Sequence, residues 1–240
     1  LKLSAHIIMC SDPIGIVLMC HGFRSNPVRD FSGCAQWFNE RGFIICMIDQ
    51  RAHGESEGKY ISYGIKERFD VKSWCEFLTE KYPGLPIVLD GISMGGACVL
   101  MASSVGLPSA VKCIIADCGY TSPADICKKV LKERFHLPPF PVYYAARLLT
   151  RIIAGFDFEE ASSYKALEKN TLPVLIAHGK IDTFVPFEMS LKNAEHCKIC
   201  ECNLILADHA EHALAYLAES QRYTKAILDM FKKCNIEFKQ

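Results

Sequence analysis

Leu89-Asp90-Gly91-Ile92-Ser93-Met94-Gly95-Gly96 is the stretch that decides the fold of this chain. The apolar run Pro86–Asp90 around its start is typical of a strand, and Gly95–Ser104 is typical of a helix. Gly-x-Ser-x-Gly between a strand and a helix indicates a nucleophile elbow, a sharp turn that exposes a reactive serine. The flanking glycines suit this turn because a Cβ would have no room beside neighbouring elements. The alternative interpretation is a glycine-rich turn with a structural role alone.

Outward from this turn, short apolar runs alternate with longer helical stretches. The expected strands are Gly15–Cys20, Phe43–Asp49, Pro86–Asp90, Lys112–Asp117, Pro173–Ala177 and Cys202–Leu206, with Leu3–Met9 as an antiparallel edge strand. The expected helices outside residues 118–170 are Pro27–Glu40 (with Asn26 as its N-cap), Ile65–Lys81, Gly95–Ser104 and Ser220–Lys232. Nearly continuous apolar strands are expected where helices cover both faces of a sheet. The order predicts a single α/β domain over residues 1–240, with a mostly parallel central sheet flanked by helices.

The alternation stops between residues 118 and 170. We expect helices at Pro123–Phe135 and Val142–Ile153, joined by a proline-rich bend at Leu137–Pro141. This helical cap insertion is either a packed excursion or a lid above a pocket, and we favour the lid because loops beyond strand ends usually build α/β sites. Six of its side chains are expected either to line an apolar substrate pocket or to form the core of the insertion: Phe135, Leu137, Phe140, Tyr143, Tyr144 and Leu148.

Composition excludes several classes of protein. The 27 basic and 27 acidic residues among 240 give no net charge, which argues against a nucleic-acid footprint. The longest apolar runs are far shorter than the roughly 18 residues of a membrane span. The odd count of 13 cysteines favours reduced thiols and a cytoplasmic location. A signal or anchor upstream of Leu1 stays open, since the chain begins without Met.

A metal site is considered at one place in the sequence. His196, Cys197, Cys200 and Cys202 include a Cys-x-x-Cys spacing, but structural zinc sites usually take a second such pair, and the sequence has none. We therefore interpret this cluster as the entry to a strand and expect no metal.

A serine hydroxyl needs a base that takes its proton and an acid that orients the base. Asp182 follows the expected strand Pro173–Ala177, and we predict that it is the acid. Two histidines follow the last strand, and we favour His212 over His209 as the base because His212 directly precedes a helical segment. The remaining histidines outside the turn at His21 are interpreted as turn or surface residues.

Acyl transfer also needs two backbone N–H groups aimed at the developing oxyanion. Met94 supplies one at the N-terminus of the helix after the elbow. Phe23 supplies the other, in His21-Gly22-Phe23 at the end of the strand Gly15–Cys20, where His21 and Gly22 shape the turn.

These motifs together resemble the serine α/β-hydrolases, in particular bacterial esterases and monoglyceride-lipase-like members. The resemblance covers nearly the whole chain. It rests on the segment at His21-Gly22-Phe23, the turn Asp49-Gln50-Arg51-Ala52-His53-Gly54-Glu55-Ser56, the elbow, His178-Gly179 through Asp182 to Pro186, and Glu211-His212-Ala213. The family usually has glycine where Ala52 stands, a departure outside the catalytic positions. The chain order Ser93, Asp182, His212 also matches this family rather than the chymotrypsin or subtilisin order.

The expected function is therefore hydrolysis of carboxylic esters through an acyl-enzyme intermediate, with short or medium acyl chains or aromatic acid esters as substrates. The alternatives are a thioesterase, amidase or acyltransferase using the same catalytic triad, and a non-catalytic binding module of the same fold. The expected partner is a small-molecule ester, and the mechanism requires no metal or organic cofactor.

Overall fold

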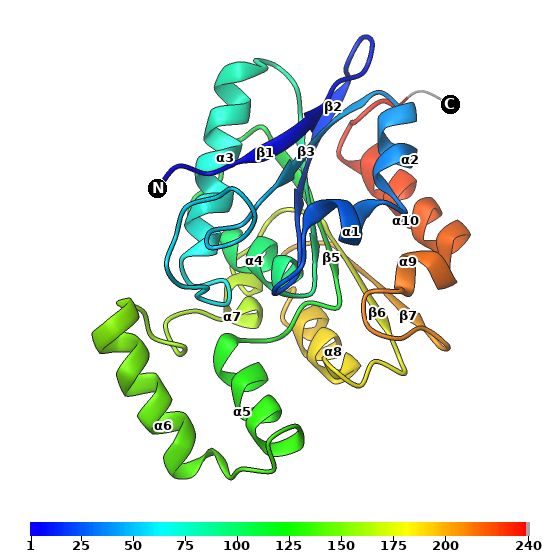
Figure 1. The fold of residues 1–240 in the computed structure, drawn as a ribbon. Coiled ribbons are helices and arrows are strands. Elements are labelled where there is room, and N and C mark those ends of the chain that lie inside the picture. The colour runs from blue at the N-terminus through cyan, green and yellow to red at the C-terminus, as the bar shows by residue number, and fades with distance from the viewer. Residues whose placement is uncertain (239–240) are drawn as a thin grey trace.

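A seven-stranded sheet runs through the middle of the computed structural model, which describes residues 1–238 (Figure 1). The strand order is β1-β3-β2-β4-β5-β6-β7. Six strands are parallel, and β1 pairs antiparallel with β3 at one edge. The strands are β1 (Ala5–Ile8), β2 (Gly15–Cys20), β3 (Phe43–Ile48), β4 (Ile87–Ile92), β5 (Val111–Asp117), β6 (Val174–Gly179) and β7 (Cys202–Ala207). This sheet confirms the predicted fold class and the antiparallel edge strand.

Helices cover both faces of the sheet and explain the continuous apolar strands. In β2, Ile16, Leu18 and Cys20 belong to the core on one face, whereas Val17 and Met19 belong to the core on the other. The helices are α1 (Pro27–Phe31), α2 (Ala35–Glu40), α3 (Glu67–Lys81), α4 (Met94–Ala102), α5 (Pro123–Glu133), α6 (Pro139–Leu149), α7 (Ser163–Leu167), α8 (Phe187–Glu195), α9 (Ala215–Ala218) and α10 (Ser220–Lys233), with a π-helical segment η1 (Thr150–Ala154).

The two faces carry different helices. The first core contains side chains of α3, α4 and α7, and the second contains side chains of α1, α2, α9 and α10. Every strand of the parallel part therefore has one face toward each core. Because the carboxyl ends of parallel strands meet at one edge, the loops after β2, β4, β6 and β7 are brought together there.

The predicted single helix Pro27–Glu40 is wrong. The Asn26 side chain caps its start by accepting the Arg29 N–H at 2.9 Å, as expected, but α1 ends at Phe31. A second helix, α2, begins at Ala35. Gly33 lies in the break, where a Cβ would be 3.2 Å from Leu217 of α9. The break lets the loop approach α9 closely. Gly33 and Leu217 are 184 positions apart in the sequence, so no local pattern around Gly33 could have predicted their contact.

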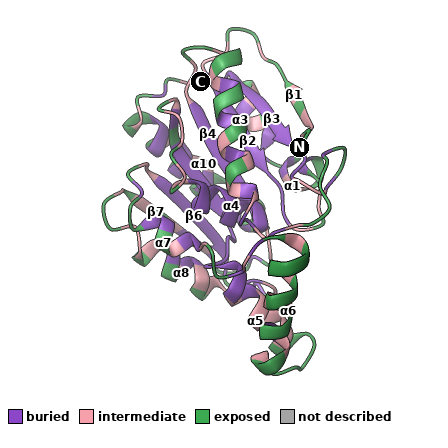
Figure 2. Ribbon diagram, turned by 90° about the vertical axis from the view of Figure 1, so that its left-hand side faces the viewer, coloured by how far each residue is buried: buried purple, intermediate pink, exposed green. Residues whose placement is uncertain are grey.

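Residues 118–170 contain no strand in the part of the chain that the structure describes. Helices α5 and α6 project beyond the sheet as a hairpin, and much of its outer surface is exposed (Figures 1 and 2). Its inner side packs on a small core of five buried residues: Ile65, Ala124, Tyr143, Phe156 and Phe158. Arg147 donates to Asp157 at 2.6 Å and ties α6 to the segment that follows η1.

Within residues 1–238, no helix has both the length and the apolar character needed to cross a bilayer.

Gly95 fixes how closely α4 packs against the sheet. A Cβ on Gly95 would lie 1.7 Å from the carbonyl oxygen of Cys20 in β2. We expect Gly95→Ala to lower the free energy of unfolding by about 3 kcal/mol or more, because backbone atoms of a central strand cannot move aside. Urea denaturation measures this change.

Gly33→Ala is the matched control, since its new Cβ would be close only to the end of the flexible Leu217 side chain, at 3.2 Å, and in ordinary contact with the Tyr216 ring at 3.8 Å. Its expected cost is below about 1 kcal/mol. Equal stability of the two variants would contradict the proposed role of the Gly95 contact.

Candidate active site

Ser93 lies on the turn between β4 and α4 in a backbone conformation that serine rarely adopts. Its φ is +57° and its ψ is −114°, a combination that costs about 1–3 kcal/mol and persists only when surrounding contacts enforce it. The Ser93 N–H donates to the Asp117 carbonyl at 2.8 Å. Gly91 allows the tight turn, because a Cβ there would lie 2.3 Å from the Gly95 carbonyl oxygen. These contacts produce the sharp turn that the sequence predicts.

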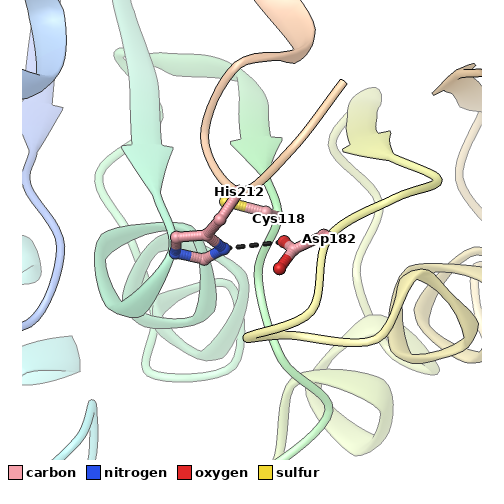
Figure 3. A group of neighbouring side chains, drawn as sticks. All are labelled: Cys118, Asp182 and His212. Carbon is pink, nitrogen blue, oxygen red and sulfur yellow. Dashed lines mark hydrogen bonds and ion pairs between the residues drawn. The ribbon is translucent and has the colours of Figure 1, made fainter. Parts of the chain in front are cut away.

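The structure brings Ser93, His212 and Asp182 into one hydrogen-bonded row. His212 Nε2 lies 3.0 Å from Ser93 Oγ. On its other side, His212 Nδ1 lies 2.6 Å from Asp182 Oδ2, the pair joined by a dashed line in Figure 3. An ionised carboxylate only accepts hydrogen bonds, so Nδ1 carries the proton that it donates to Asp182. Nε2 is then left to accept the Ser93 hydroxyl proton. The three residues lie 89 and 30 positions apart in sequence and come from the loops after β4, β6 and β7.

His209, the alternative base, does not take part in this row. Its side chain is exposed, whereas the imidazole of His212 lies between Ser93 and Asp182. The geometry therefore separates two histidines that the sequence leaves in competition.

Asp182 is held by four hydrogen bonds. Its Oδ1 accepts the backbone N–H groups of Phe184 at 2.8 Å and Val185 at 2.9 Å. Its Oδ2 faces both His212 and His178, the latter at 3.1 Å. Burial acts to raise the pKa of Asp182, but the bonds to His178 and His212 outweigh it and bring the pKa well below the usual range for aspartate. Asp182 is therefore ionised at neutral pH.

His178 is a positioning residue that the sequence interpretation missed. It is fully buried at the end of β6, not on a turn or the surface as predicted. Its Nε2 lies 2.8 Å from the Val185 carbonyl oxygen, and its Nδ1 lies 2.6 Å from Ser190 Oγ of α8. The ring thus connects α8 to the loop that carries Asp182. The four-residue spacing from His178 to Asp182 is a signal that could have indicated this contact.

The loop after β2 is shaped around Asp30. Gly22 N–H donates to Asp30 Oδ2 at 2.7 Å, and Ser25 Oγ–H donates to Asp30 Oδ1 at 2.6 Å. Within residues 1–238, the backbone N–H groups of Phe23 and Met94 donate to no protein acceptor. Both predicted oxyanion donors are therefore without a protein acceptor in the described residues, and Met94 is the first residue of α4 beside Ser93.

A cavity of about 480 Å³ opens beside Ser93 and His212. Its walls come from the loop after β2, from α2 and from the C-terminal segments around α9 and α10. The residues along these walls include Phe23, Arg24, Cys34, Phe38, Asp90, Asp117, Phe184, Leu217, Tyr223 and Ile227.

None of the six side chains predicted for a pocket lines this cavity. Tyr143 is buried in the small core of the hairpin, one of the two roles that the sequence left open. The other five are exposed on the hairpin: Phe135, Leu137, Phe140, Tyr144 and Leu148. Helical spacing predicts that these side chains share one side of a helix, but it cannot predict which part of the protein that side packs against.

Cys118 lies beside the Asp182–His212 pair (Figure 3), and ligand atoms of the three residues are all within 4.8 Å of one another. The chemistry of this group does not suit a metal. Burial raises the pKa of the Cys118 thiol well above its usual range, so the thiol stays protonated. The Nδ1 of His212 is already committed to Asp182, so the arrangement serves hydrogen bonding rather than metal binding.

The sequence and the fold of this chain are similar to those of known hydrolases. The model of a family described as serine aminopeptidase, S33, matches residues 11–133. The chain is 26% identical over 226 residues to the uncharacterized protein YqkD of Bacillus subtilis, covering 93% of this chain and 73% of YqkD. The esterase Pf2001 of Pyrococcus furiosus has a TM-score of 0.73 at 20% identity, covering 97% of this chain and 92% of the esterase. Est1E of Butyrivibrio proteoclasticus, solved with ferulic acid bound, has a TM-score of 0.72 at 21% identity, covering 97% and 95%.

The hydrogen bonds to Asp182 make stability depend on pH. Because its pKa is lowered in the folded state, its contribution is fully present above the unfolded pKa of about 4 and is lost as pH falls through the folded pKa. We expect Asp182→Asn to cost about 1.5–3 kcal/mol at pH 7. The difference from the unsubstituted protein should shrink steadily below about pH 4.

Urea denaturation of both proteins between neutral and strongly acidic pH measures this difference. A stability difference that stays constant over the whole range would mean that Asp182 is not held as a buried carboxylate.

Proposed function

Because the chain belongs to the serine aminopeptidase S33 family of α/β hydrolases, we propose that it is a serine hydrolase that cleaves carboxylic esters through an acyl-enzyme intermediate. One observation carries this proposal. The Ser93 hydroxyl, the His212 imidazole and the buried Asp182 carboxylate form a continuous row of hydrogen bonds at the wall of an open cavity. This is the arrangement that makes an alcohol oxygen nucleophilic.

In the acylation step, Ser93 Oγ bonds to the ester carbonyl carbon while His212 Nε2 takes the hydroxyl proton. Asp182 stabilises the imidazolium that forms and holds its Nδ1–H in place. The oxyanion accepts hydrogen bonds from the Phe23 and Met94 backbone N–H groups. The carbon–oxygen bond to the alcohol then breaks, and His212 donates its proton to the departing alkoxide.

Deacylation reverses these roles with water as the nucleophile. His212 takes a proton from water, whose oxygen bonds to the acyl carbon. The bond from that carbon to Ser93 Oγ breaks, and His212 returns the proton to the serine. The carboxylic acid leaves, and the protein is restored without a cofactor.

Esters are the proposed substrate class because the structural neighbour Pf2001 is an esterase and the neighbour Est1E binds ferulic acid, an aromatic acid. Short or medium acyl chains and aromatic acid esters fit a cavity of about 480 Å³. The family description names an aminopeptidase, so amide hydrolysis on the same three side chains is the second candidate. Competition between matched ester and amide substrates distinguishes the two activities.

Ser93→Ala tests the proposed nucleophile. We expect kcat/KM for p-nitrophenyl acetate to fall by about 10⁴-fold or more, because the members of such a triad act as a unit. The control is Ser103→Ala, at the far end of α4, whose hydroxyl only donates to the Leu100 carbonyl. Its kcat/KM should equal that of the unsubstituted protein. Full turnover by Ser93→Ala would refute the mechanism.

The hairpin of residues 118–170 remains our candidate lid. Its support is an unusual row of exposed apolar side chains on α6 and η1: Phe140, Tyr144, Leu148, Leu149, Ile152 and Ile153. Contiguous exposed apolar surface of this kind commonly marks a binding site. In this proposal it contacts the distal part of a medium-length acyl chain that extends out of the cavity.

Replacing both Leu148 and Ile152 by Ser tests the lid. The loss of apolar contact should reduce kcat/KM for a p-nitrophenyl decanoate by a factor of about five or more, equivalent to about 1 kcal/mol. Hydrolysis of p-nitrophenyl acetate, which is too short to reach the hairpin, serves as the internal control. A parallel loss for both esters, or for neither, would exclude this role of the hairpin.

A further inference from the structure

Two buried acids line the cavity that begins at Ser93. Asp90 lies on β4 and Asp117 on the adjacent β5, and both side chains belong to the cavity wall. In the sheet, Asp90 pairs with Ile115 and Asp117 pairs with Ile92, so the two acids occupy diagonal positions. Because side chains alternate along a strand, both acids lie on the face of the sheet that packs on α2 and α10. Only 4% of Asp90 and 2% of Asp117 is exposed.

Neither acid has the full set of hydrogen bonds that a buried carboxyl group normally makes. The Cys118 thiol is a hydrogen-bond partner of the Asp117 carboxyl group, but Asp117 Oδ1 is buried and has no partner. The Asp90 carboxyl group makes no hydrogen bond or ion pair with the protein within residues 1–238, and its oxygens, unlike Asp117 Oδ1, are not fully enclosed. An unpaired buried polar atom such as Asp117 Oδ1 destabilises the fold by about 1–3 kcal/mol, and neither acid takes part in the hydrogen-bonded row of Ser93, His212 and Asp182. Two acids in this setting fit a ligand that supplies hydrogen-bond donors.

Two neighbouring acids in a buried site favour the binding of a cation. Burial raises the pKa of Asp90 to about 8, and the neighbouring Asp117 adds to the increase. Burial also raises the pKa of Asp117, to about 6. Burial and the proximity of the two carboxyl groups therefore disfavour ionisation of both at once. The arginines of the cavity wall, Arg24 and Arg29, are exposed on the loop after β2 and on α1.

We infer that Asp90 and Asp117 form a subsite that binds a primary ammonium group carried by the substrate. The inference deepens the proposed function, on which it rests, by naming the substrate class as an ester or amide with an aminoalkyl or aminoacyl part. An ammonium group has three N–H donors, enough for the free Asp117 Oδ1 and for Asp90. Its positive charge favours the ionised form of an acid beside it.

The other walls of the cavity fit the rest of such a substrate. Phe38 and Ile227 offer apolar surface to the methylene groups that separate the ammonium from the reacting carbonyl. The rings of Tyr216 and Tyr223 also line the cavity, and aromatic faces attract cations. A neutral alkyl chain would use the same apolar walls but would leave both carboxyl groups unpaired.

The test measures binding of n-butylammonium and of the neutral, similarly sized 1-pentanol. Both are used as competitive inhibitors of p-nitrophenyl acetate hydrolysis by the unsubstituted protein, and as ligands in calorimetric titrations of Ser93→Ala, which need no activity. We expect n-butylammonium to bind at least about tenfold more tightly than 1-pentanol. Equal binding of the two ligands would overturn the inference.

Asp90→Asn, Asp117→Asn and the control Asp229→Asn identify the subsite. Asp229 is exposed on the outer side of α10, so its variant should bind n-butylammonium as the unsubstituted protein does. Asp90→Asn and Asp117→Asn should each weaken n-butylammonium binding about tenfold or more without weakening 1-pentanol binding. Thermal melts accompany each variant, and removing an unpaired buried acid should leave Tm unchanged or raised.

The outcomes separate this inference from the proposed function. If the unsubstituted protein hydrolyses p-nitrophenyl acetate but n-butylammonium binds equally to all three aspartate variants, the subsite is refuted and the hydrolase proposal stands. If hydrolysis is absent while Ser93→Ala still binds n-butylammonium through Asp90, the hydrolase proposal fails and the ammonium site stands.

Discussion

The strained turn at Ser93 is the constraint on which the rest of the site depends. A serine at φ +57° is maintained because two glycines let α4 press against β2 and β4, and because Asp117 of β5 accepts the Ser93 N–H. Three central strands therefore hold one side chain at the edge where the loops after β6 and β7 also end. The same packing points the N-terminus of α4 at the space in front of the serine hydroxyl, where a negative charge would develop.

The acidic side chains near this turn differ in how many hydrogen bonds the protein gives them. Asp182 receives four hydrogen bonds and stays ionised, which fixes the tautomer and orientation of His212. Asp90 and Asp117 receive almost none, although they lie in the same cavity as Ser93. The protein thus supplies the hydrogen bonds of Asp182, which orients the proposed base. In our proposal, a substrate in the cavity supplies those of Asp90 and Asp117.

The sequence predicted the parts of the fold that depend on local pattern. The apolar strands agree with the structure to within about two residues, because burial on both faces requires continuous apolar runs. The residues of the hydrogen-bonded row could also be predicted, because the elbow, the acid and the base each follow a strand. Local pattern did not predict the break after Phe31, the buried role of His178 or the residues of the cavity walls. Each depends on contact between elements distant in sequence, such as Gly33 with α9 or His178 with α8.

Covalent labelling tests whether His212 activates Ser93 as a nucleophile. The folded protein is treated with a fluorophosphonate, digested, and mapped by mass spectrometry. One adduct is expected, on the peptide that contains Ser93, and it should be lost when His212 is replaced by Ala. An adduct on a different residue, or unmodified Ser93 in folded protein, would mean that Ser93 is not the activated nucleophile.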